Sequence, residues 1–120
     1  MFEIREGQRE EIQKFELYDA NNDGESVIVA EQNGEIVGYV QYTNNDIFFM
    51  QSEGKGCGRA MIEFLQEGGD IGCERRDELR AINCLPGARG FYEKLGFEKA
   101  SRSMFGNNPD YLWLWYRDEN

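Results

Sequence analysis

Residues 51–65, QSEGKGCGRAMIEFL, decide the fold of this chain. Within this stretch, residues 54–59 form a glycine-rich segment. Its three glycines alternate with Lys55 and Cys57, and Arg59 follows the last glycine. The apolar residues 47–50 precede this glycine-rich segment, and apolar side chains then recur at spacings of three and four. This order predicts a strand, a tight turn and a helix.

The glycine-rich segment has the properties of an anion-binding site. Glycine allows a tight turn and a close approach of the backbone to a ligand. The N–H groups at the start of the following helix attract negative charge. Lys55 and Arg59 add positive charge at the same place. We therefore expect a phosphate or pyrophosphate here, with a flexible loop before a surface helix as the plain alternative.

Two other phosphate-binding motifs do not fit the spacing. A P-loop places four residues between its first glycine and a Gly-Lys-Ser/Thr sequence, which does not occur here. A dinucleotide fingerprint has the pattern Gly-x-Gly-x-x-Gly, but Arg59 and Met61 stand three residues after Gly56 and Gly58. The sequence therefore excludes both motifs.

The composition is typical of one globular domain over residues 1–120. A chain of 120 residues can bury one core, and 40% hydrophobic and 13% aromatic residues argue against disorder. No apolar run approaches the length of a membrane span. The opening sequence, MFEIRE, is typical of a strand rather than a signal segment. We therefore expect no membrane partner.

The charge and the reactive residues narrow the chemistry. The net charge of −10 opposes nucleic-acid binding and suits a cationic acceptor such as an amine, although an acidic surface also serves solubility. The absence of histidine excludes a histidine-containing zinc site and a Ser-His-Asp triad. The three cysteines lack metal-ligand spacing, and residues 19–24 lack the pattern of a calcium loop, so we expect no metal. We interpret the cysteines as reduced thiols of a cytoplasmic protein.

Apolar periodicity and turn residues predict the remaining elements. The N-terminal part contains a strand, a helix and a three-stranded antiparallel meander, over residues 2–5, 8–18, 26–32, 35–43 and 46–50. The helix of the glycine-rich segment ends near Gln66. A strand, a short helix and two strands follow, over residues 78–84, 88–95, 97–102 and 111–117. The elements predict an α+β fold with a mixed, mostly antiparallel sheet of about six to seven strands, flanked by about three helices.

Two segments together resemble the GNAT superfamily of acyl-CoA-dependent N-acetyltransferases. Residues 54–62, GKGCGRAMI, are similar to the family's Arg/Gln-x-x-Gly-x-Gly/Ala turn. Residues 88–97, ARGFYEKLGF, are similar to its Ala-x-x-x-Tyr-x-x-x-Gly-Phe helix. The order of the predicted elements also fits the family along nearly the whole chain. The resemblance implies transfer of an acetyl group from acetyl-CoA to a primary amine of a small molecule or peptide, by direct attack without a covalent enzyme intermediate.

The resemblance also implies roles for individual residues. The backbone N–H groups between Gly54 and Arg59 would bind the CoA pyrophosphate, and the preceding strand end would pair with the pantetheine arm. Tyr92 would protonate the departing thiolate, and a strand N–H near Met50 would polarise the thioester carbonyl. Asn83 would hydrogen-bond the pantetheine or cap a turn. The implied cofactor-binding residues are Phe48, Phe49, Met50, Gln51, Gly54, Lys55, Gly56, Cys57, Gly58, Arg59 and Asn83.

The chain departs from the family pattern in two places. In the register that best fits the helix, Glu53 stands where the family has Arg or Gln, whereas a second register puts Gln51 there. An acidic side chain at this position does not favour a pyrophosphate. The segment between the first two strands has room for one helix instead of the usual two. The acceptor side is therefore open, or completed by a second subunit of a homodimer.

Several assignments keep a structural alternative. Tyr92 also suits a core position, and Cys57 suits a small core side chain better than a nucleophile. The general base stays open between Asp46, Glu53, a water chain and no dedicated base. The alternative function is a catalytically inactive GNAT-like module that binds CoA or a protein partner. A third interpretation, an unrelated phosphate-binding protein, predicts no preference for CoA over ATP.

Overall fold

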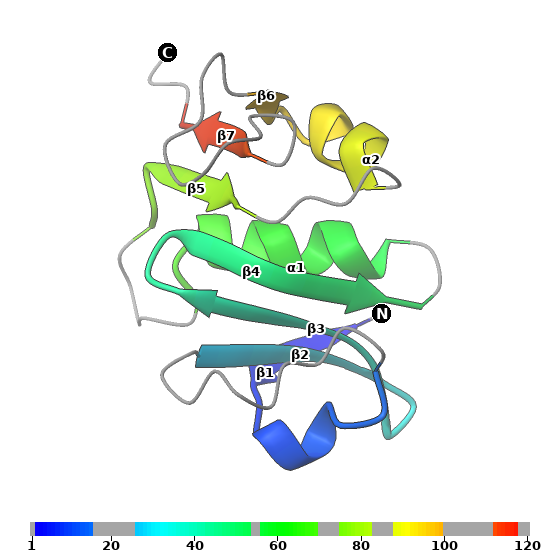
Figure 1. Cartoon of the computed structure of the whole chain (residues 1–120). Coiled ribbons are helices and arrows are strands. Elements are labelled where there is room, and N and C mark those ends of the chain that lie inside the picture. The colour runs from blue at the N-terminus through cyan, green and yellow to red at the C-terminus, as the bar shows by residue number, and fades with distance from the viewer. Residues whose placement is uncertain are drawn as a thin grey trace.

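The computed structural model describes residues 2–15, 26–53, 56–69, 75–82, 88–99 and 112–117. Its elements, in chain order, are β1 (Glu3–Glu6), the 3-10 helix η1 (Arg9–Glu11), β2 (Ser26–Gln32), β3 (Glu35–Thr43), β4 (Asp46–Ser52), α1 (Cys57–Gln66), β5 (Glu78–Ala81), α2 (Arg89–Lys94), β6 (Glu98–Lys99) and β7 (Trp113–Tyr116). The seven strands form one sheet in the order β1-β2-β3-β4-β5-β7-β6 (Figure 1). β4 and β5 run parallel, and the other neighbouring pairs run antiparallel. This confirms the predicted mixed, mostly antiparallel sheet; two α-helices and η1 are described, against about three helices predicted.

Strands β2 and β3 form the hairpin that the Asn33-Gly34 pair predicts. Both turn residues have positive φ angles, 55° for Asn33 and 79° for Gly34, as a two-residue type I′ turn requires. The register pairs Gln32 with Glu35 across the turn, and both strands have the bounds predicted from the sequence. β4 extends past its predicted end to Ser52.

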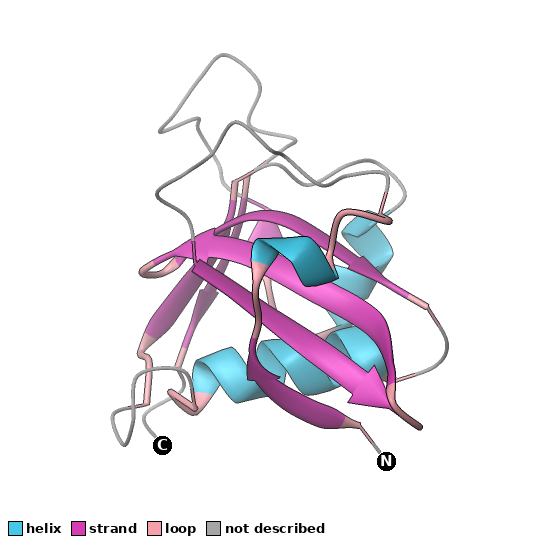
Figure 2. Ribbon diagram, turned by 90° about the horizontal axis from the view of Figure 1, so that it is seen from below, coloured by secondary structure: helices cyan, strands magenta, loops and turns pink. Residues whose placement is uncertain are grey.

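Helices cover both faces of the sheet, with α1 and η1 on opposite sides (Figure 2). Alternation along β2 places Ile28 and Ala30 in the core beneath α1, and Val27 and Val29 in the core beneath η1. The α1 core comprises the buried residues Ile28, Ala30, Val40, Tyr42, Ile47, Cys57, Met61, Ile62, Leu65, Leu79, Ala81, Tyr92, Phe97 and Trp113. The η1 core comprises Ile12, Phe15, Val27, Val29 and Tyr39.

The helix predicted over residues 8–18 is replaced by a shorter element. η1 is followed by a turn that continues to Phe15, and residues 16–25 lie outside the described part of the chain. Ile12 and Phe15 already reach the η1 core from this turn, so their burial does not require a longer helix. Arg5 of β1 holds η1 in place, because its Nη1 and Nη2 donate to the two carboxylate oxygens of Glu11 at 3.1 and 2.6 Å.

Within the described residues, the C-terminal elements occupy only part of the segments that the sequence pattern predicts. β5 ends at Ala81, and α2, β6 and β7 each occupy part of a predicted segment. Residues 83–87 and 100–111 lie outside the described residues. The loop predicted near residues 106–109 is therefore outside the description, as are Cys73 and Cys84.

Two arginines attach the C-terminal end of α1 to the segments that flank β5 and β7. The buried Arg76 donates from Nη1 to the carbonyl oxygen of Leu65 at 2.7 Å, and Arg117 donates from Nη2 to the carbonyl oxygen of Gln66 at 2.7 Å. Both acceptors belong to the last helical turn, where a positive charge complements the helix dipole. These contacts fix one end of α1.

Gly38 on β3 lets the first turn of α1 pack directly against the sheet. A Cβ atom at this position would lie 2.7 Å from Sγ of Cys57, 3.0 Å from Cε of Met61 and 3.2 Å from the carbonyl oxygen of Gln51. The Cys57 thiol also donates to the carbonyl oxygen of Val37 at 3.8 Å. The missing side chain at Gly38 therefore sets where α1 begins relative to β3 and β4.

We expect Gly38→Ala to lower the free energy of unfolding by about 1–3 kcal/mol, the usual cost of overpacking a close-packed interior. The added methyl group must displace the buried first turn of α1. Urea unfolding measures the loss. Gly90→Ala is the matched control, because nothing lies within 4 Å of a Cβ atom there. The control should keep or raise stability, since alanine is a better helix former than glycine. Equal losses in the two variants would contradict the packing role of Gly38.

Candidate functional site

β4 and β5 are paired at one end and diverge at the other (Figure 1). In the described part of the chain, the parallel register contains Asp46 opposite Arg80 and Ile47 opposite Ala81. The Ile82 N–H donates to the carbonyl oxygen of Ile47 at 3.1 Å. β4 then continues to Ser52 alongside β3. We call this divergence the fork.

A β-bulge lies where the fork begins. The β3–β4 register pairs Gln41 with Phe49 but Tyr42 with Ile47, so Phe48 is an extra residue in β4. A bulge of this kind bends its strand and increases the local twist. Ile47 and Met50, three residues apart, both contact the α1 core, which strict alternation along an unbroken strand would not allow. The inserted Phe48 therefore lies at the point where β4 bends away from β5.

Beyond the bulge, β4 presents backbone groups to the fork. The N–H of Glu53 donates to the carbonyl oxygen of Val37 at 2.8 Å, so Glu53 faces β3. Hydrogen-bonding directions alternate along an antiparallel strand, so Gln51 shares that side. Met50 and Ser52 consequently direct their N–H and C=O groups away from β3, toward the fork. This edge has the geometry that an extended ligand needs to pair as an added strand.

The N-terminus of α1 lies next to the end of β4. Gly56 is the N-cap residue, with a left-handed φ of 85°, and no side chain caps the helix. The first N–H groups of a helix have no intrahelical acceptor, and the first turn of α1 contains no acidic residue. The helix dipole therefore adds partial positive charge at this end of α1, and no carboxylate within the first turn opposes it.

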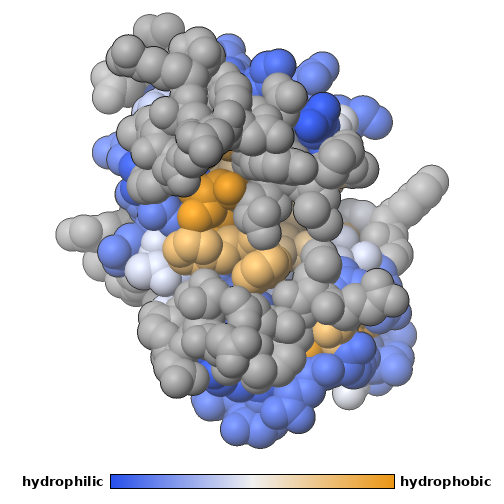
Figure 3. All heavy atoms as spheres, in the orientation of Figure 1, coloured by the Kyte–Doolittle hydropathy of each residue, from blue (hydrophilic) through white to orange (hydrophobic). Residues whose placement is uncertain are grey.

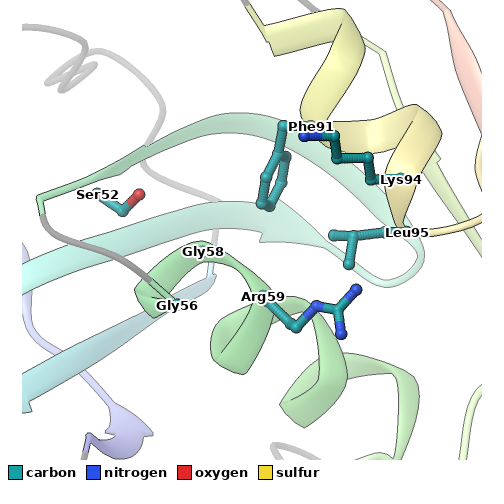
Figure 4. A pocket seen from close by; sticks show the side chains of 7 residues that line it. All are labelled: Ser52, Gly56, Gly58, Arg59, Phe91, Lys94 and Leu95. Carbon is teal, nitrogen blue, oxygen red and sulfur yellow. The ribbon is translucent and has the colours of Figure 1, made fainter.

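A groove of about 270 Å³ joins this helix end to α2 (Figure 4). Its walls are Ser52, Gly56, Gly58, Arg59, Phe91, Lys94 and Leu95. Figure 4 shows the Phe91 ring directed from α2 toward Gly58. A Cβ atom at Gly58 would lie 2.9 Å from Cζ of Phe91, so glycine is what allows α2 to approach α1 this closely. The groove combines an apolar wall with two basic side chains.

The basic side chains of the groove come from two different helices. Arg59 is well exposed, and its Nε lies 4.0 Å from a carboxylate oxygen of Glu63, the residue one turn later. An exposed ion pair of this length contributes little, so Arg59 can turn to another anion at low cost. Lys94 is exposed near the end of α2. A phosphate group in the groove would therefore meet two cations as well as the helix N-terminus.

Tyr92 lies in the α1 core with 4% of its surface exposed. Its ring contacts those of Phe91 and Phe97 edge-on, with centroids 5.2 and 5.1 Å apart. The ring is therefore a core side chain, whatever chemistry its hydroxyl serves. α2 stops just after it, where Gly96 takes a φ of 92°.

Cys57 begins α1 but faces the sheet. Its thiol is fully buried, and burial raises the thiol pKa, with a further contribution from the negative charge of Glu53. A raised pKa keeps the thiol protonated at neutral pH, and only the thiolate is an effective nucleophile. Cys57 is therefore a packing residue, which confirms the core position that the sequence favoured.

The two carboxylates considered as a general base differ in their surroundings. Asp46 is engaged across the base of the fork, where its Oδ1 lies 2.5 Å from Nε of Arg80. Glu53 is exposed just before the glycine-rich segment. The ion pair of Asp46 with Arg80 ties β4 to β5. The general base thus stays open.

Most of the site residues predicted from the sequence lie around the fork and the groove. Gly56, Gly58 and Arg59 line the groove, Met50 and Gln51 lie on β4 beside it, and Phe48 and Phe49 form the bulge. Gly54, Lys55 and Asn83 are outside the described residues. The sequence interpretation missed the groove-lining residues Ser52, Phe91 and Leu95. The spacing of Phe91, Lys94 and Leu95, which places them on one face of α2, is the signal that could have found the groove.

In the described ranges, no three Asp, Glu, Cys or His side chains come together as a metal site. No helix in those ranges is long and apolar enough to cross a membrane.

Comparisons with known proteins agree on a family and a fold. A family model described as "Acetyltransferase (GNAT) domain" matches residues 23–99. The solved structure of a protein from Rhodopseudomonas palustris, described as "GCN5-Related N-acetyltransferase: Aminotransferase, Class-II", is similar, with a TM-score of 0.58 and 18% sequence identity. The similarity covers 78% of this chain and 62% of that one, so this chain spans less than two thirds of its length. At this identity the similarity shows the fold. No curated protein matches the chain.

We expect Cys57 to resist alkylation in the folded protein. Its burial and raised pKa both suppress thiolate formation at pH 7.5. Iodoacetamide labelling followed by peptide mass spectrometry measures modification at this cysteine alone. Labelling in urea provides the control, because unfolding removes the burial. Rapid labelling of Cys57 under native conditions would contradict the packing role and reopen a nucleophilic one.

Proposed function

Because the chain belongs to the GNAT acetyltransferase domain family, we propose that it transfers an acetyl group from acetyl-CoA to a primary amine by direct attack. One observation carries this proposal: the fork between β4 and β5 lies beside the uncapped N-terminus of α1 and the groove that leads to α2. A long ligand with an anionic part and an extended amide-containing arm matches this combination.

The described residues fit the parts of acetyl-CoA. The pyrophosphate would accept hydrogen bonds from the first N–H groups of α1, beside Arg59 and Lys94. The pantetheine arm would pair with the edge of β4 at Met50 and Ser52. When bound, acetyl-CoA supplies the activated acetyl group. The chain supplies position, charge and a water-poor surface around it.

The chemical step needs few groups from the protein. The amine nitrogen forms a bond to the acetyl carbon and loses a proton to a general base or to water, the carbon–sulfur bond breaks, and the thiolate takes a proton. The Met50 N–H, which points toward the fork, suits a hydrogen bond to the carbonyl oxygen. Tyr92 suits the proton donor, because its phenol O–H can give a proton to the departing thiolate. The protonated, buried Cys57 supports transfer without an acyl-cysteine.

We expect Tyr92→Phe to reduce turnover by about 10²–10⁴-fold, the usual contribution of general acid catalysis, with little change in the KM for acetyl-CoA. The change removes the hydroxyl and keeps the ring in the α1 core. Amine-dependent release of the CoA thiol measures turnover. Tyr42→Phe is the matched control, because it removes another buried tyrosine hydroxyl from the same core. Equal turnover in wild type and Tyr92→Phe would remove Tyr92 from the chemistry.

We expect Glu53→Gln to tighten acetyl-CoA binding by about two- to fivefold, the scale of an exposed charge interaction. Glu53 places a negative charge close to the glycine-rich segment, where it opposes a pyrophosphate. Titration at low and high salt tests whether the change in affinity is electrostatic, since salt screens exposed charges. Glu35→Gln, at the β2–β3 hairpin, changes the net charge equally and should leave affinity unchanged. Weaker binding by Glu53→Gln would mean that Glu53 contacts the cofactor favourably.

The charge of Glu53 and the burial of Tyr92 favour one second candidate, a GNAT-like module that binds acetyl-CoA without catalysis. This candidate predicts binding of acetyl-CoA with no release of CoA when amines are added. The transferase predicts release that depends on the amine.

A further inference from the structure

In the described residues, one face of the β4–β5–β7 part of the sheet reaches a core cluster only through Phe49 of β4, which packs against the η1 core. On β5, Leu79 and Ala81 point into the α1 core, which assigns Glu78 and Arg80 to the opposite face. On β7, Trp113 belongs to the same core, which assigns Leu114 to the opposite face. We call this opposite face, next to the fork, the outer face.

Apolar side chains gather on the outer face. Phe48 follows the core residue Ile47 and stands with Phe49 opposite Gln41, on the face away from α1. Ile82 follows the core residue Ala81 and extends the β4–β5 ladder by one residue through its N–H, so it is assigned to the same face. Phe48, Ile82 and Leu114 are half-buried, and none belongs to either core cluster of the described residues. In Figure 1 β4 passes in front of α1, and Figure 3, in the same orientation, shows apolar atoms across the middle of this face.

The charged groups nearest the fork on the outer face neutralise each other. Asp46 and Arg80 pair at 2.5 Å, and the register places Leu114 directly beside Arg80. Among the other described carboxylates, Glu78 lies at the far end of β5, Glu98 lies beyond Leu114 on β6, and Glu53 follows the end of β4. Of the described carboxylates, only the paired Asp46 therefore lies at the start of the fork, where a second cationic group of an acceptor would need an uncompensated negative charge.

In the described part of the chain, the outer face is the side from which an acceptor can reach the fork. The opposite side is occupied by the α1 core, and the groove between α1 and α2 suits the cofactor. An amine that approaches over Phe48 and Ile82 brings its own body against apolar side chains. Such a surface stabilises an apolar group and offers nothing to a polycation.

We infer that the acceptor is a primary monoamine whose amino group is joined by a short chain to a flat apolar group, which packs on Phe48, Ile82 and Leu114. This inference rests on the proposed acetyl transfer and names the substrate class of the same site. Phe48 and Ile82 determine specificity in this assignment. By itself, the net charge of −10 favours a polycationic acceptor. The net charge and the apolar outer face therefore predict different acceptors.

The test compares 2-phenylethylamine, spermidine and ethanolamine as acceptors, with release of the CoA thiol from acetyl-CoA as the readout. We expect kcat/KM for 2-phenylethylamine to exceed that of each other amine by tenfold or more. In Phe48→Ser and Ile82→Ser, the preference for 2-phenylethylamine over ethanolamine should fall about tenfold, mainly through KM, as for a lost hydrophobic contact. Ile82→Ser leaves the β4 bulge intact and so keeps the test valid if Phe48→Ser does not fold. Phe64→Ala is the control, because Phe64 packs against the α1 core on the other face.

The possible outcomes separate the inference from the proposed function. A preference for spermidine, or equal losses for all three amines in both outer-face variants, overturns the inference and leaves acetyl transfer intact. Binding of acetyl-CoA with no turnover of any amine also overturns it. A dimer that sedimentation detects in the wild type and not in Phe48→Ser identifies the outer face as a subunit contact and overturns it as well. Failure to bind acetyl-CoA overturns the proposed function itself, and the inference with it.

Discussion

The contact between Gly38 and the first turn of α1 fixes the geometry on which the site depends. Because position 38 has no side chain, Cys57 and Met61 pack directly on β3. The start of α1 is thereby set beside the end of β4. Arg76 and Arg117 hold the other end of the helix. A helix N-terminus fixed in this way can present its N–H groups to a ligand without further ordering, which lowers the entropic cost of binding.

One inserted residue in β4 has several consequences for the same site. The Phe48 bulge returns Met50 to the α1 core and coincides with the point where β4 leaves β5. Beyond it, the backbone groups of Met50 and Ser52 face the fork. Alternation also directs the Phe48 side chain to the outer face, toward an approaching acceptor. The Phe48 bulge thus shapes both the β4 edge proposed for the cofactor and the outer face proposed for the acceptor. The Asp46–Arg80 ion pair holds β4 and β5 together just before the bulge.

Local signals in the sequence predicted the local structure well. The Asn33-Gly34 turn, the meander and the helix after the glycines were predicted because turn chemistry and periodicity act over a few residues. The bulge was not predicted, since it depends on the register between β3 and β4, and Phe48 looks like any strand residue. The helix over residues 8–18 was too long in the prediction, because Ile12 and Phe15 satisfy a helical period and also fit a single turn. The groove was not predicted, because its lining comes from β4, α1 and α2, which are brought together only in the folded chain.

The most direct test of the site is a calorimetric titration of the purified chain with acetyl-CoA, with ATP as a matched phosphate ligand. Binding to the fork and the helix end together requires the pantetheine arm as well as the phosphates. We predict saturable binding of acetyl-CoA and no comparable binding of ATP. Equal binding of both ligands would mean that the glycine-rich segment recognises phosphate alone, and binding of neither would contradict the cofactor site.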